Sequence, residues 1–131
     1  MITVEGADRV AASLLATAVT VQEGAATVVA EQGAQLRTAV QAHASGRPGP
    51  EIVTGAFHGG IALEVEGGVS PSAEVSSDAP QAFRLEFGFN GADSLGRVYH
   101  QPPYPSFGPA FDEVSPGLYD ELAAMVTAAV Q

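Results

Sequence analysis

The sequence predicts one α+β domain spanning residues 1–131. Three observations support this fold class: a long helical pattern at the N-terminus, short alternating segments between glycines in the middle, and a second helical pattern at the C-terminus. The expected elements are a long N-terminal helix, either continuous or broken, a small antiparallel sheet of three to four strands, a short central helix and a C-terminal helix. A chain of 131 residues buries only a moderate core, so oligomerisation would add stability.

The N-terminal helix is predicted over about residues 8–44, where apolar residues recur every three or four positions. Gly24 and Gly33 each cost about 1 kcal/mol relative to alanine inside a helix. We therefore expect a break or kink near one of them, and two helices in line are nearly as well supported as one.

The two halves of this helix are expected to make different contacts. The half with Leu14 and Leu15 is assigned to the core, because large apolar side chains bury the most area. The alanine-rich half, Gln22 to Ala44, buries little area but allows another helix to approach closely. Ala25 and Ala39 are therefore predicted to lie at contacts between subunits.

The middle of the chain follows a linker of serine, glycine, arginine and proline at residues 45–50. Thr54 is expected to cap one helical turn, and Gly67-Gly68 to form a hairpin turn. Residues 90–96 are expected to form a flexible turn. The predicted strands are residues 61–65, 69–75 and 97–101.

Residues 77–111 hold five of the six phenylalanines and five of the nine prolines. Asp78 and Pro80 predict the start of a short helix, and Gly88 predicts its end in a left-handed conformation. The later prolines predict a stiff extended connector that leads to a C-terminal helix starting at Ser115-Pro116. Four phenylalanines are expected to be buried anchors: Phe83, Phe87, Phe107 and Phe111.

Composition argues against several function classes. The formal charge of −10 has the wrong sign for gripping nucleic-acid phosphates. The absence of cysteine excludes thiolate catalysis and cysteine-ligated zinc, and the three histidines have no metal-ligand spacing. We expect no enzyme activity, no cofactor, no metal and no membrane segment. Glu86 is expected to form a structural ion pair with Arg84 or Arg97.

Three short segments occur in a distinctive order: Thr54-Gly55, Glu86-Phe87-Gly88 and Pro109-Ala110. Together with the surrounding aromatic and proline residues, this order resembles the neck or tail-completion proteins of long-tailed bacteriophages. The resemblance covers about Pro50 to the C-terminus and, loosely, the helical N-terminal third. The aromatic pattern and the resemblance together give nine expected structural anchors: Thr54, Gly55, Phe83, Glu86, Phe87, Gly88, Phe107, Pro109 and Phe111.

The resemblance implies a virion protein that forms a ring, with six subunits the expected number, at the head-to-tail junction. Such a ring would contact head connector or stopper proteins on one side and tail terminator or tail tube proteins on the other. Double-stranded DNA would pass through its lumen without sequence-specific binding, and the subunit would reside in the host cytoplasm before assembly. The acidity suits a DNA channel and general solubility equally well. Contact residues are expected to include Ala25, Ala39, Asn90, Asp93 and Arg97.

A second interpretation comes from a different class of proteins. A small, acidic, cytoplasmic binding or regulatory module, monomeric or dimeric, would have the same length and charge. The oligomeric state and the neighbouring genes distinguish the two interpretations.

Overall fold

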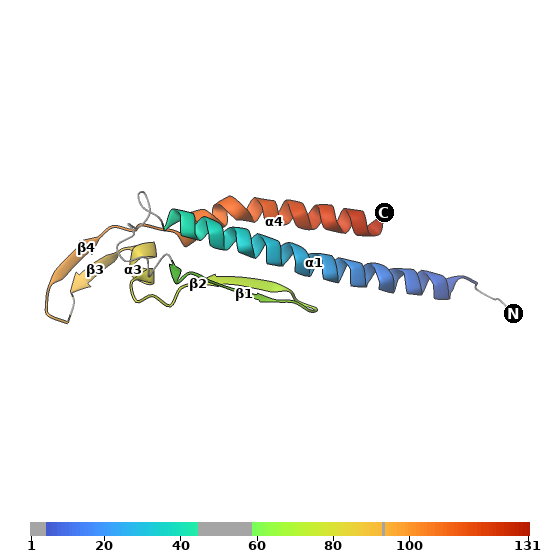
Figure 1. Cartoon of the computed structure of the whole chain (residues 1–131), viewed down its shortest axis with the longest axis horizontal. Coiled ribbons are helices and arrows are strands. Elements are labelled where there is room, and N and C mark those ends of the chain that lie inside the picture. The colour runs from blue at the N-terminus through green and yellow to red at the C-terminus, as the bar shows by residue number, and fades with distance from the viewer. Residues whose placement is uncertain (1–4, 45–58, 93) are drawn as a thin grey trace.

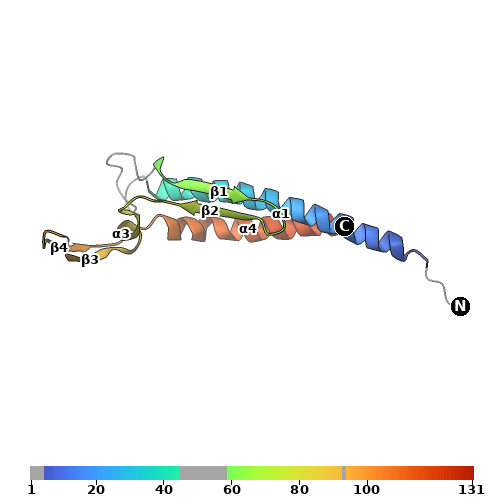
Figure 2. The ribbon, with the colours of Figure 1, turned by 90° about the horizontal axis from the view of Figure 1, so that it is seen from below.

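The computed structural model describes residues 5–44, 59–92 and 94–131. Two helices form an elongated body: α1 (Ala7–His43) and α4 (Phe107–Val130) lie side by side and run in opposite directions (Figure 1). A hairpin of two strands packs along α1, and a second hairpin lies at the end of the body opposite the N-terminus (Figure 2). The α+β prediction is confirmed.

The helix α1 is continuous over 37 residues, so the predicted break near a glycine is absent. The glycines instead allow close packing on other elements. A Cβ atom added at Gly24 would lie 2.7 Å from Met125, and one added at Gly33 would lie 2.5 Å from the Cβ of Ala73. The cost of glycine in the helix is therefore offset at Gly33, where the first hairpin approaches closely, whereas Gly24 meets only the flexible side chain of Met125.

The half of α1 that contacts the core is the C-terminal half, whereas the N-terminal half was predicted to do so. Leu14 and Leu15 are exposed, whereas the alanine-rich half supplies the buried residues of the helix. The buried residues of α1 are Val28, Gln32, Gly33 and Val40. The reason is length: α4 has 24 residues and α1 has 37, so the N-terminal part of α1 extends past the end of α4 (Figure 1).

The strands form two separate antiparallel hairpins rather than one sheet. In the first, β1 (Ala62–Glu66) pairs with β2 (Ser72–Ser76), and Glu64 faces Glu74. In the second, β3 (Phe89–Ala92) pairs with β4 (Val98–Gln101). All three predicted strands exist, and the additional strand, β3, includes residues that were expected to form a turn. The short helix α3 (Ala82–Phe87) separates the two hairpins along the chain.

The C-terminal helix starts at Phe107, eight residues before the predicted start. Pro109 lies in its first turn, where a missing N–H costs little, and Pro116 lies inside the helix. The extended proline connector is correspondingly shorter than predicted. Asp78 does not cap α3, whose N-cap position is Gln81. Gly88 ends α3 as predicted, but its φ of 77° and ψ of 175° are extended with a positive φ rather than left-handed helical.

The small core lies where α1, β1 and α4 converge. It consists of four buried residues and four partly buried neighbours. The buried residues are Val40, Ala44, Ile61 and Ala110, and the partly buried ones are Leu36, Ala39, Val75 and Phe107. The guanidinium of Arg37 fastens β1 to α1 by donating a hydrogen bond of 2.8 Å to the carbonyl oxygen of Ile61.

Candidate functional site

The junction between α3 and α4 is built around Glu86. One carboxylate oxygen, Oε2, accepts hydrogen bonds from the backbone N–H groups of Ser106 (2.7 Å) and Phe107 (3.1 Å). The other, Oε1, accepts a hydrogen bond from the N–H of Gly108 (2.7 Å). These donors belong to the first turn of α4, which has no partners for them within the helix. Glu86 therefore caps α4 from a separate helix, and its negative charge lies at the positive end of the α4 dipole.

Ser106 occupies the N-cap position of α4 but does not cap it. Its side chain makes no capping hydrogen bond, and its hydroxyl is buried without a partner among the described residues. The capping function, which a serine usually performs at this position, is thus taken over by Glu86. The expected ion pair is replaced by this cap, since both carboxylate oxygens bind α4. The guanidinium of Arg84 lies 3.9 Å from the centroid of the Phe89 ring.

The backbone around Gly88 holds α3 in place beside α4. The N–H of Tyr104 donates a hydrogen bond of 2.6 Å to the carbonyl oxygen of Leu85. A Cβ atom at Gly88 would lie 2.8 Å from the carbonyl oxygen of Gln101 and 3.1 Å from the nitrogen of Pro103. Position 88 therefore requires glycine for two reasons: its positive φ and the close passage of the returning chain.

Three of the four phenylalanines that were predicted to be buried are exposed. Phe83 and Phe87 pack on each other with ring centroids 4.9 Å apart, but they are 72% and 68% exposed. Phe111 is also exposed, and Phe107 packs against the core. Burial was correct in part for Phe107 and wrong for the other three. A helix of six residues that directs Glu86 toward α4 leaves the face with Phe83 and Phe87 uncovered.

The predicted contact residues lie in several places. Ala25 and Ala39 are half-buried, and Ala39 packs against the core of its own chain. Asn90 is exposed on β3, where its side-chain oxygen lies 3.1 Å from Nδ1 of His100. Arg97 is exposed just before β4. Thr54, Gly55 and Asp93 lie outside the described residues.

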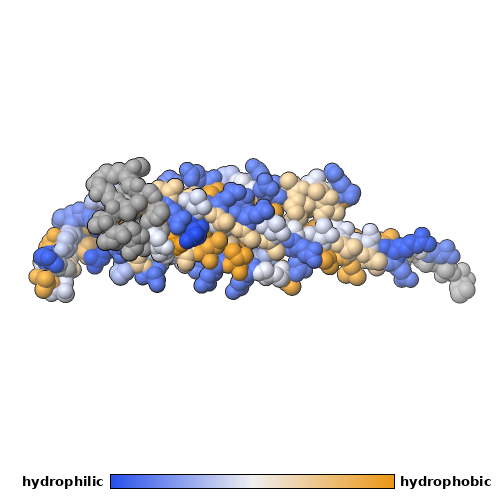
Figure 3. All heavy atoms as spheres, viewed as in Figure 1, coloured by the Kyte–Doolittle hydropathy of each residue, from blue (hydrophilic) through white to orange (hydrophobic). Residues whose placement is uncertain are grey.

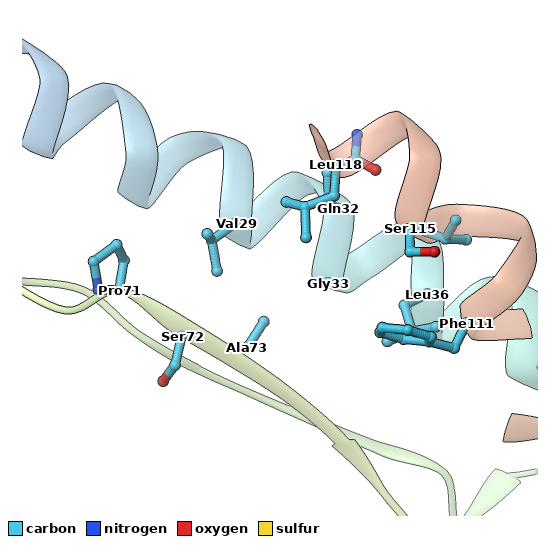
Figure 4. Close-up of a pocket in the computed structure, with 11 residues that line it drawn as sticks. Val29, Gln32, Gly33, Leu36, Pro71, Ser72, Ala73, Phe111, Ser115 and Leu118 are labelled. Carbon is cyan, nitrogen blue, oxygen red and sulfur yellow. The ribbon is translucent and has the colours of Figure 1, made fainter. Parts of the chain in front are cut away.

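A groove of about 290 Å³ lies between α1, β2 and α4 (Figure 4). Its lining carries no charged side chain. The residues that line it are Val29, Gln32, Gly33, Leu36, Pro71, Ser72, Ala73, Phe111, Val114, Ser115 and Leu118. This groove is not predictable from local sequence patterns, because it forms only where three distant segments meet.

The chemistry of the described residues is otherwise limited. Over 5–44, 59–92 and 94–131, no three histidine or acidic residues gather in a way that could hold a metal ion. His43 Nε2 lies 3.4 Å from a carboxylate oxygen of Glu113, near the α1–α4 contact. By length and composition alone, α1 is apolar enough to cross a membrane, a test that core helices of soluble proteins also pass.

Comparison of the chain with known protein families, with curated proteins and with solved structures finds no match.

Proposed function

We propose that the chain is a structural subunit of the neck of a long-tailed bacteriophage. In this role it forms a ring between the head connector and the tail and lets genomic DNA pass. The resemblance of its ordered segments to neck and tail-completion proteins supports the proposal.

One structural observation adds most to this resemblance. The segments Glu86-Phe87-Gly88 and Pro109-Ala110 are separated by 20 residues in the chain, yet they meet at the junction of α3 and α4. Glu86 caps the first turn of α4, Pro109 lies in that turn, and Ala110 is fully buried beneath it. A motif whose parts act together in space is better evidence for a shared fold than two unconnected short segments.

The shape and surface of the subunit also suit assembly with neighbours. Large apolar side chains are exposed at both ends of the elongated body: Val10, Leu14 and Leu15 at one end, and Phe83 and Phe87 at the other. A protein that functions alone rarely leaves large apolar surfaces uncovered, whereas a ring subunit covers them with its neighbours. The formal charge of −10 favours a lumen that does not retain DNA.

Deletion of the gene from a phage genome that carries it tests this function. We expect electron microscopy of the lysate to show filled heads and separate tails, and the wild-type gene supplied in trans should restore complete particles. Normal, infectious particles from the deletion strain would contradict the proposal and favour a binding or regulatory role.

A further inference from the structure

The N-terminal segment of α1, residues 7–21, contains no buried residue, and its first part projects past the end of α4 (Figure 1). We call this segment the α1 tip. Leu14 and Leu15 are 66% and 69% exposed there, and Val10 and Val19 are exposed as well. Apolar side chains of the tip are visible at the surface in Figure 3. Residues of this size gain roughly 1.5–3 kcal/mol each when they are buried, so an uncovered tip favours association.

The charge distribution permits a second copy of this chain as the partner. Two copies, each with a formal charge of −10, repel each other unless they meet at uncharged surfaces. The tip has such a surface, because Asp8 and Arg9 are its only charged residues and their charges cancel.

The groove between α1, β2 and α4 offers the matching surface. It has a volume of about 290 Å³ and no charged lining residue, and its walls come from all three elements (Figure 4). A cavity of about 150 Å³ can hold a benzene molecule, so this groove has room for roughly two leucine side chains.

The tip of a chain cannot reach its own groove. Both lie on the same continuous helix, and Leu15 is 14 residues from Val29, which corresponds to about 21 Å at 1.5 Å per residue. A groove filled by a tip is therefore filled by another copy. This contact joins two different surfaces, so repetition produces a ring or a filament.

We propose that Leu14 and Leu15 of one copy dock in the groove of the next copy. This inference deepens the proposed function, since the contact would be the repeating contact of the neck ring. It predicts a head-to-tail arrangement in which the tip and the groove of every subunit are occupied.

Cysteine cross-linking tests the contact directly, because the chain has no cysteine of its own. Leu15→Cys places a thiol on the tip, and Ser115→Cys places one in the groove. Under mild oxidation, a mixture of the two purified full-length variants should form disulfide-linked dimers of unlike chains faster than either variant alone. A chain with both substitutions should form a ladder of linked subunits. The matched control, Leu15→Cys mixed with Glu121→Cys on the exposed face of α4, should not exceed the rate of random collision.

A second pair of variants tests the same contact without cross-links. Replacing both Leu14 and Leu15 by aspartate removes the apolar surface of the tip, and Ser115→Phe fills the groove. Each variant alone should therefore be monomeric, as measured by the molar mass from light scattering. Mixed together, they retain one intact tip and one intact groove and should form dimers that do not extend. Equal cross-linking in the control mixture, or binding of the tip to phosphatidylcholine vesicles instead of to the second copy, would overturn the inference. These measurements use purified protein and test only the contact. A negative result would overturn the proposed contact, whereas the proposed function is tested separately by the gene deletion.

Discussion

Replacement of Glu86 by alanine should destabilise the fold by removing the cap of α4. The carboxylate binds three backbone N–H groups at 2.7, 3.1 and 2.7 Å, and the alanine variant leaves all three without this partner. Two of these hydrogen bonds are partly buried and one is exposed, so water replaces only some of the lost interactions. An unsatisfied buried donor costs about 1–3 kcal/mol, and we expect a total loss of about 2–4 kcal/mol in the free energy of unfolding.

Urea denaturation followed by circular dichroism measures this loss. Glu86→Gln keeps one acceptor oxygen without the charge and should lose about half as much free energy of unfolding as Glu86→Ala. Glu121→Ala, on the exposed face of α4, is the control and should change that free energy by no more than about 0.5 kcal/mol. A Glu86→Ala variant as stable as this control would refute the capping argument.

The two helix glycines should respond in opposite ways to alanine. Gly33→Ala should destabilise the protein by up to about 2 kcal/mol, because the new Cβ lies 2.5 Å from the Cβ of Ala73 on a strand, and this overpacking outweighs the gain in helix propensity. Gly24→Ala should be neutral or stabilising by up to about 1 kcal/mol, since the new Cβ meets only the flexible side chain of Met125. Thermal melts measure the stability of both variants. A Gly24→Ala variant that is less stable than Gly33→Ala would show the packing argument to be wrong. Replacing Glu64 by threonine removes a like charge directly opposite another glutamate in the first hairpin, and should raise the free energy of unfolding by about 0.2–1 kcal/mol, a gain that should shrink in high salt.

Local sequence patterns predicted which helices and strands form better than they predicted which elements contact each other. The helical period of α1, the alternation in the first hairpin and the position of the glycine that ends α3 are properties of neighbouring residues, and these predictions were confirmed. The start of α4 was missed because its cap, Glu86, comes from 20 residues earlier in the chain. A serine followed three positions later by proline, Ser106 and Pro109, was the available local signal for that start.

Burial was the least predictable property, because it depends on where the partner element ends. Leu14 and Leu15 look like core residues in any local pattern, yet α4 is too short to reach them. Phe83 and Phe87 have the spacing of a buried face, but the neighbouring face of α3, which carries Glu86, is the one that contacts α4. The groove could not be predicted either, since Val29, Ala73 and Ser115 come together only in the folded chain.

Electron cryomicroscopy of the neck in particles whose genome carries this gene shows whether the chain forms a neck ring. We expect a ring between connector and tail in which each repeat contains an antiparallel pair of helices of 37 and 24 residues. The projecting tip of the longer helix should lie against the neighbouring repeat, and Glu86 should lie at the start of the shorter helix. A neck whose density is fully accounted for by other chains, with no such helix pair, would contradict the account.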